Sequence, residues 1–128
     1  MDKWLDRFSQ FHPSSKEEAI FVYADSHLSF VSIHHFFDGN GRMARLMSNF
    51  PLLQSGFPPI IISNKKRKDY TNICAQFQIT KRIFPDKDDC SQFIIFLDEQ
   101  WNSTWDIINK AYEQQKTRDI LHKENGIN

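Results

Sequence analysis

One stretch of twelve residues, 34–45, constrains the fold of this chain more than any other part of the sequence. It reads His-His-Phe-Phe-Asp-Gly-Asn-Gly-Arg-Met-Ala-Arg and contains two of the four glycines in a chain of 128 residues. Apolar residues recur at helical spacing on both sides of it, over about 16–33 and about 40–55. The sequence therefore predicts two helices joined by a short loop that contains glycine.

The loop has the residue types that bind a phosphate group. Gly39 and Gly41 can adopt positive φ at little steric cost, so the backbone N–H groups around Asn40 can turn inward as an anion nest. Asn40 also favours the start of a helix, which would place this nest at the positive end of the helix dipole. Arg42 and Arg45 are three residues apart and share one face of that helix, from which both guanidinium groups can hold phosphate oxygens.

Two further side chains of the loop suit chemistry on a phosphate. Asp38 directly precedes the nest, where one carboxylate can hold a Mg²⁺ ion that otherwise binds water and phosphate oxygens. His34 lies at the end of the preceding apolar helix, where a neutral imidazole can take a proton from a hydroxyl.

The alternative to phosphate chemistry is a metal site built from the histidines and the carboxylate of this region: His27, His34, His35 and Asp38. Imidazole ligands often lie three or four residues apart on a helix, but no second cluster completes a zinc site.

Composition and charge narrow the class of protein. The length fits one domain, which we expect over 1–122, followed by a frayed tail at 123–128. Sixteen basic and sixteen acidic residues give a net charge of zero, which provides no general attraction to nucleic acid or to acidic membranes. No run of 18 apolar residues occurs, and the charged N-terminus does not resemble a signal peptide. We therefore expect a cytoplasmic protein, although delivery into another cell would leave no mark in the sequence.

The rest of the chain also favours helices. Twelve phenylalanines and three tryptophans against few valines and threonines are typical of helices with aromatic cores. Further helices are predicted over about 2–11, 65–78 and 87–121. Ser15 and Glu18 form a capping box before the 16–33 helix, and Gly56 is expected to end the 40–55 helix. Cys74 and Cys90 have no metal-ligand spacing and are predicted to be buried thiols in a reducing compartment.

Four finer expectations concern the helix interiors and breaks. The inner side of the 40–55 helix is predicted to contain its large apolar residues: Met43, Leu46, Met47, Phe50 and Leu53. Pro51 lacks a backbone donor, so we expect a kink or an early end of that helix. The three isoleucines 60–62 are predicted to form a short buried extended segment. The helix over 87–121 is long enough to suggest a break near Asn102.

The loop resembles the signature of the Fic domain family, His-Pro-Phe-x-Asp/Glu-Gly-Asn-Gly-Arg-x-x-Arg, at eight of its nine specified positions. The exception is His35, where the family usually has proline. The resemblance continues through 46–62 and through Arg67-x-x-Tyr70, and about 100 of the 128 residues can be aligned with the core of the family. It implies an all-α helical bundle with the motif loop between two central helices.

The resemblance also implies an activity. In the family the motif histidine activates a Tyr, Thr or Ser hydroxyl of a target protein, which attacks the α-phosphate of ATP and receives AMP while pyrophosphate leaves. The chain would then be a protein adenylyltransferase with His34 as general base, Asp38 as the Mg²⁺ ligand and Phe36 as the buried anchor of the loop. The residues expected to bind the nucleotide and its phosphates are Gly39, Asn40, Gly41, Arg42, Arg45, Arg67 and Tyr70. Arg45 is expected on the terminal phosphate.

Two features of the family are not matched in the sequence. Only 33 residues precede His34, and none of them resembles the upstream β-hairpin flap that binds the target segment. The inhibitory pattern Ser/Thr-x-x-x-Glu-Gly/Asn is also not matched. A separate chain is one candidate source of the flap or the inhibition. The alternatives are that nothing inhibits the protein, or that the control segment was lost with the N-terminus. The alternatives to an active transferase are a nucleotide-binding remnant without transfer, which His35 and Pro51 favour, and a helical interaction module.

Overall fold

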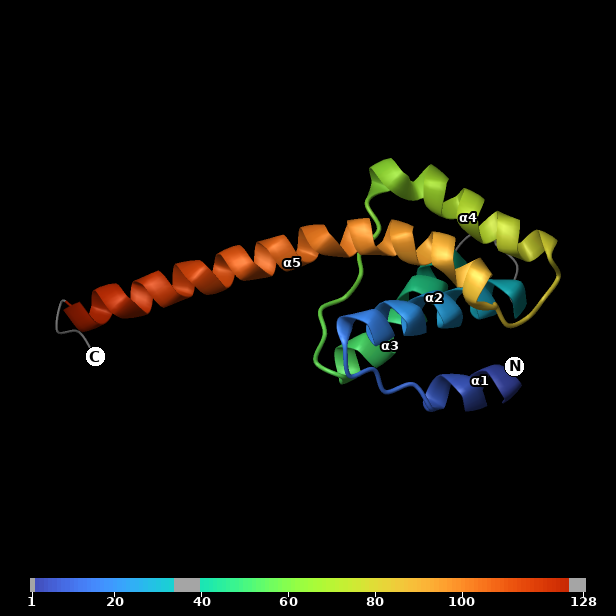
Figure 1. The fold of residues 1–128 in the computed structure, drawn as a ribbon, viewed down its shortest axis with the longest axis horizontal. Helices are drawn as coiled ribbons and strands as arrows, with labels where there is room; N and C mark the ends of the chain where they lie inside the picture. The colour runs from blue at the N-terminus through green and yellow to red at the C-terminus, as the bar shows by residue number, and fades with distance from the viewer. Residues whose placement is uncertain (1, 34–39, 125–128) are drawn as a thin grey trace.

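The computed structural model describes residues 2–33 and 40–124, which form an all-α fold (Figure 1). The elements are α1 (Asp2–Ser9), α2 (Lys16–Ile33), α3 (Asn40–Gln54), the short 3-10 helix η1 (Asn64–Lys66), α4 (Arg67–Ile79) and α5 (Lys87–Glu124). None of the residues in these two described ranges belongs to a strand. The all-α prediction is confirmed, and α2 and α3 flank residues 34–39 in the sequence.

The centre of the fold is α2, which contacts α1, α3, α4 and α5. Residues 22–31 of this helix are all buried. Asp25, Ser26, His27 and Ser29 are buried as well. A helix that is covered on all sides must be apolar or must find partners for its polar groups within the protein. Asp25, His27 and Ser29 find such partners on the neighbouring helices α1, α3 and α4.

The start of α2 agrees with the sequence prediction, but its cap differs in one bond. The Ser15 hydroxyl accepts the backbone N–H of Glu18 at 3.1 Å, as expected for a capping box. The Glu18 carboxylate accepts the backbone N–H and the hydroxyl of Ser14 at 2.8 and 2.9 Å. These bonds hold the pKa of Glu18 below its usual value. The reciprocal bond of the capping box is therefore displaced by one residue.

The short helix α1 is held on α2 by one aromatic and one ionic contact. The indole N–H of Trp4, a residue that is 2% exposed, donates to the Ser29 hydroxyl at 2.8 Å. The Arg7 guanidinium binds both carboxylate oxygens of the fully buried Asp25. Because an unpaired carboxylate in the interior is costly, this pair fixes α1 on the centre of the fold.

In α3 the predicted interior face is wrong, although the helix bounds agree to within one residue. Four of the five large apolar residues predicted inside are largely exposed: Met43 47%, Leu46 64%, Phe50 50% and Leu53 51%. The buried residues are instead Ala44, Ser48, Pro51 and Leu52, of which Ala44, Ser48 and Leu52 recur every four residues. The small Ala44 and Ser48 suit a close approach to α2, where the Ser48 hydroxyl lies 3.3 Å from the Nδ1 atom of His27. Periodicity alone assigns the larger side chains to the interior and does not detect such a polar contact.

The end of α3 is set by Gly56 and not by Pro51. The helix includes Pro51 and continues to Gln54, so the expected early end at the proline is wrong. Gly56 has φ +84°, a conformation that favours glycine. The Phe57 N–H donates to the Leu52 carbonyl at 2.8 Å and the Gly56 N–H to that of Leu53 at 3.2 Å, the two bonds of a Schellman motif. Gly56 therefore ends the helix as predicted.

The segment after α3 is buried at one isoleucine only. Ile60 is 1% exposed, whereas Ile61 is 62% exposed, so the prediction of three buried isoleucines is correct only for Ile60. The Asn49 side chain accepts the backbone N–H of Ile60 at 2.8 Å and donates to its carbonyl at 3.0 Å. These two bonds replace the backbone pairing that an extended segment would otherwise find in a sheet.

The bounds of the last two helices lie within three residues of the predicted ones. The α4 residues Tyr70, Cys74 and Phe77 are buried, as was predicted for the Cys74 thiol. Cys74 and Cys90 are both buried and form no disulfide. α5 is continuous through Asn102, so the suggested break is wrong. From residue 106 to 124 every residue of α5 is exposed, and this half of the helix extends away from the other helices in Figure 1.

The described part of the chain contains no helix that is both long and apolar enough to cross a membrane. α5 runs to Glu124, and residues 125–128 of the predicted tail lie outside the described residues. The extent of the predicted 1–122 domain stays a prediction.

Candidate functional site

The first turn of α3 contains the described part of the motif. Asn40 begins α3 as predicted, and Gly41 and Arg42 follow in its first turn. The first backbone N–H groups of this 15-residue helix have no partner within the helix and form its positive end. Four predicted site residues lie outside the described residues, and their roles stay predictions: His34, Phe36, Asp38 and Gly39.

The two predicted arginines of α3 differ in their surroundings. Arg42 is exposed, whereas Arg45 is half-buried. The Cζ atom of Arg45 lies 5.4 Å from the centre of the Tyr70 ring, within the range of a cation–π contact. The structure therefore brings Arg45 of α3 together with Tyr70 of α4, which are 25 positions apart in the sequence.

Tyr70 lies beneath Arg45 and is 2% exposed. Burial raises the pKa of its hydroxyl, while the nearby charges of Arg45 and Arg67 act in the opposite direction. Arg67 is exposed and begins α4, one turn before Tyr70. Three of the predicted nucleotide-site residues are thus in one place. Tyr70 supports this place from inside the protein, and the arginines are the groups that solvent can reach.

The buried His27 connects Tyr70 to α2. Its Nε2 atom lies 2.7 Å from the Tyr70 hydroxyl, and its Nδ1 atom lies 3.3 Å from the Ser48 hydroxyl. Burial lowers the pKa of His27 to about 3, so the ring is neutral at ordinary pH. Both ring nitrogens already have partners, which disfavours the alternative that His27 binds a metal. The described residues contain no group of three or more His, Cys, Asp or Glu side chains that could hold a metal ion.

Comparison with known proteins finds one family that part of the chain resembles. Residues 1–52 match the sequence model of the Fic/DOC family. Over this stretch the chain is similar to Fic-domain proteins. The protein adenylyltransferase Fic of Nematostella vectensis is 41% identical over 73 residues, which are 55% of this chain and 17% of that relative. Relatives with the same name from Drosophila erecta and Drosophila persimilis are each 38% identical over 71 residues, which are 54% of this chain and 13% of each relative.

The matched stretch thus spans less than a fifth of the length of these Fic relatives. No solved structure matches this chain. The stretch that matches the family model includes α1, α2, the motif residues 34–39 and most of α3.

Sequence reasoning about the Fic motif did not find the pair of His27 and Ser48. It considered His27 only as a metal ligand and did not consider Ser48. A signal was present, because both are polar residues within apolar helices, and buried polar side chains usually bond to one another. The pairing itself depends on how α2 and α3 cross, which the sequence does not give.

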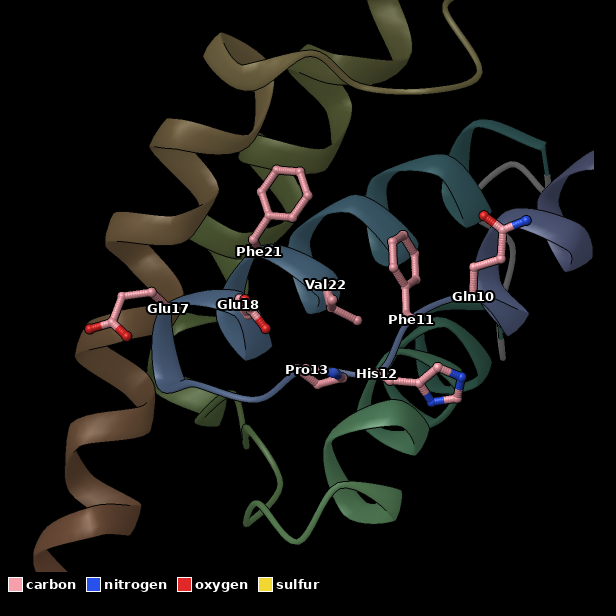
Figure 2. Close-up of a pocket in the computed structure, with 8 residues that line it drawn as sticks. All are labelled: Gln10, Phe11, His12, Pro13, Glu17, Glu18, Phe21 and Val22. Atoms are coloured by element: carbon pink, nitrogen blue, oxygen red, sulfur yellow. The ribbon is translucent and has the colours of Figure 1, made fainter.

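A cavity of about 420 Å³ lies away from the Fic motif, between the 10–13 linker and the first turns of α2 (Figure 2). In Figure 2 two carboxylates lie on one side of Val22, and His12 with Gln10 lies on the other. The lining consists of Gln10, Phe11, His12, Pro13, Glu17, Glu18, Phe21 and Val22. The carboxylates of Glu17 and Glu18 would repel the phosphates of a nucleotide. This cavity is therefore not the nucleotide site.

Proposed function

We propose that this chain binds ATP with Mg²⁺ and transfers AMP to a Tyr, Thr or Ser hydroxyl of a target protein. The observation that carries the proposal is the position of Arg45, which lies one turn after the start of α3 and above the buried Tyr70. A helix start followed by two arginines presents three sources of positive charge to a phosphate chain. The similar proteins of Nematostella vectensis and Drosophila erecta are named protein adenylyltransferases, which supports transfer of AMP to a protein.

The proposed step is an in-line displacement at the α-phosphorus. The target hydroxyl loses its proton to His34, and its oxygen forms a bond to the α-phosphorus. The bond from that phosphorus to the bridging oxygen breaks, and pyrophosphate leaves with the negative charge. Arg42 and Arg45 stabilise the charge that develops on the phosphate oxygens.

Asp38 is the residue that we propose as the Mg²⁺ ligand. One carboxylate is sufficient, because Mg²⁺ keeps several waters and binds phosphate oxygens for the rest of its shell. When bound, the ion would neutralise charge on the phosphates that leave.

The proposed partners are the target protein and a separate chain that supplies the flap or the inhibition. The two buried thiols without a disulfide support a reducing compartment, for which we propose the cytoplasm.

The experiment compares two labels on ATP. The protein is incubated with Mg²⁺, a cell lysate and ATP labelled at either the α- or the γ-phosphate. Relative to the same lysate without the protein, we expect additional protein-bound label from α-labelled ATP only, because AMP retains the α-phosphate. Additional transfer from γ-labelled ATP would contradict the proposal and indicate phosphate transfer instead.

A second candidate is a nucleotide-binding domain without transfer. It is favoured by His35, which stands where the family signature has proline, directly after the proposed base. This candidate predicts that calorimetry detects binding of Mg·ATP while neither label appears on protein. Binding together with α-label transfer would exclude it.

A further inference from the structure

The hydrogen bonds around His27 have a defined direction. The Ser48 hydroxyl donates its proton to the Ala44 carbonyl at 2.6 Å, so its oxygen is left as an acceptor for the His27 ring. A neutral imidazole has a single N–H. If Nδ1 holds this proton, it can donate to Ser48, and Nε2 is then the acceptor. The Tyr70 hydroxyl, 2.7 Å from Nε2, must therefore be the donor in that bond.

This direction fixes what Tyr70 can offer to Arg45. With its proton directed at His27, the Tyr70 oxygen has only lone pairs left, and these suit a donor. Arg45 is such a donor, and while burial raises the pKa of the Tyr70 hydroxyl, the positive charge of Arg45 acts to lower it. The guanidinium lies over the Tyr70 ring, with Cζ 5.4 Å from the ring centre. Arg45 is thus placed over one buried side chain whose hydroxyl can accept a hydrogen bond.

We propose that His27 and Tyr70 are positioning residues that hold the Arg45 guanidinium where it meets the terminal phosphate of ATP. The inference rests on the proposed function, because it assigns Arg45 to a nucleotide phosphate. His27 belongs to the central helix α2, Arg45 to α3 and Tyr70 to α4, so three helices fix the direction of one flexible side chain. An arginine held in advance loses less conformational freedom when the phosphate binds, which increases affinity.

The structure offers a matched pair of substitutions that test this role. Tyr70→Phe keeps the ring beneath Arg45 and removes the hydroxyl between Arg45 and His27. Tyr23→Phe is the control, since Tyr23 is equally buried and its ring stacks on His27 with centroids 5.6 Å apart. Its hydroxyl has no hydrogen-bond partner among the described residues, so the control removes a buried hydroxyl beside the same histidine without breaking the network.

The measurement is calorimetric titration with Mg·ATP and with Mg·ADP. The ratio of the two affinities reports the contact with the terminal phosphate, whereas a loss of stability alone would weaken both nucleotides together. We expect Tyr70→Phe to reduce this ratio roughly 3- to 10-fold, the worth of about one hydrogen bond. Tyr23→Phe should leave the ratio unchanged. In Arg45→Ala the ratio should already be reduced, and adding Tyr70→Phe should reduce it no further.

The outcomes separate this inference from the proposed function. If the unchanged protein binds no ATP, the nucleotide proposal falls and this inference falls with it. If it prefers ATP and Tyr70→Phe keeps the full preference, only the positioning role is overturned. An equal reduction in Tyr70→Phe and Tyr23→Phe also overturns it, since the effect would then be one of packing.

Should Tyr70→Phe fail to fold, Ser48→Ala removes the acceptor of the His27 Nδ1–H and should reduce the ratio of the ATP and ADP affinities in the same direction. An unchanged ratio in Ser48→Ala would overturn the role.

Discussion

The Arg7 guanidinium holds both oxygens of the Asp25 carboxylate, with N–O distances of 2.9 and 2.6 Å, and thereby joins α1 to the central helix. Asp25 is fully buried, whereas the Arg7 side chain is 40% exposed. Removal of Arg7 would leave a buried carboxylate without its cation, a costly change. The pair also raises the pKa of Arg7 through the hydrogen bond to Asp25, against the opposing effect of burial.

We predict that Arg7→Ala lowers the free energy of unfolding by about 2–4 kcal/mol, somewhat less than for a fully buried pair because solvent reaches Arg7. The measurement is urea denaturation at neutral pH. The control is Arg82→Ala, which removes an exposed arginine paired with Asp86 and Asp89 and should change stability little. Equal effects of the two substitutions would contradict the role given to the buried pair.

The fold should lose stability in mild acid because His27 is buried in its neutral form. Its pKa is about 3 in the folded protein, against an ordinary value of 6.5. Between these values the unfolded chain binds more protons, so the free energy of unfolding should fall as the pH decreases from about 6.5, at up to roughly 1.4 kcal/mol per pH unit. Burial raises the pKa of the neighbouring Tyr23 and Tyr70, which therefore stay neutral throughout this window.

The measurement is urea denaturation at pH 7, 6 and 5. His27→Gln should show a smaller decrease over this range than the unchanged protein. The exposed His12 provides the control, because His12→Gln should keep the full decrease. A decrease that persists in His27→Gln would assign the acid sensitivity to other groups.

Substitutions on the buried and the exposed face of α3 should differ strongly in how much stability they cost. Leu52 is fully buried, so Leu52→Ala should cost about 2–5 kcal/mol. Leu46 is 64% exposed, and Leu46→Gln should stay within about 0.5 kcal/mol of the unchanged protein. Thermal or urea unfolding of both variants provides the comparison. A large loss of stability in Leu46→Gln would show that Leu46 is buried, as helical periodicity predicted.

Replacing the proposed base should separate binding from transfer. We predict that His34→Ala reduces AMP transfer by about 10²–10⁴-fold, the usual contribution of a positioned general base, and leaves ATP affinity nearly unchanged. The adjacent His35→Ala is the matched control and should matter much less. Transfer is measured with α-labelled ATP and affinity by calorimetry. Equal losses at both positions would instead favour a metal site that uses both histidines.

Replacing the proposed Mg²⁺ ligand Asp38 should change how AMP transfer depends on Mg²⁺ concentration. In the unchanged protein transfer should rise with Mg²⁺ concentration, whereas Asp38→Ala should remove this dependence together with the activity. A Mg²⁺ titration of label transfer in both proteins is the measurement. Asp88→Ala serves as a control, because Asp88 is an exposed residue in the first turn of α5. Retention of a normal Mg²⁺ response in Asp38→Ala would remove Asp38 from the metal site.

The sequence by itself determined the start of α2 and the end of α3. The serine cap at the start of α2 and Gly56 at the end of α3 are local signals, because each involves backbone bonds within a few residues. The motif at 34–45 revealed the resemblance to the Fic family for a similar reason, since its residue types are contiguous. Its bonding geometry at residues 34–39 lies outside the described residues, so the roles of His34 and Asp38 rest on the sequence alone.

The tertiary structure decided which side of each helix is inside and which polar groups meet. Ser48 is buried in place of Leu46 because its hydroxyl lies between the Ala44 carbonyl and the His27 ring. Tyr70 lies beneath Arg45 because α4 packs on α2 and directs the hydroxyl to His27. Helical periodicity shows how hydrophobic residues are spaced along one helix. It does not predict the partners of His27, which are Ser48 and Tyr70, 21 and 43 residues away. Such contacts depend on how the helices cross, which only the packed chain determines.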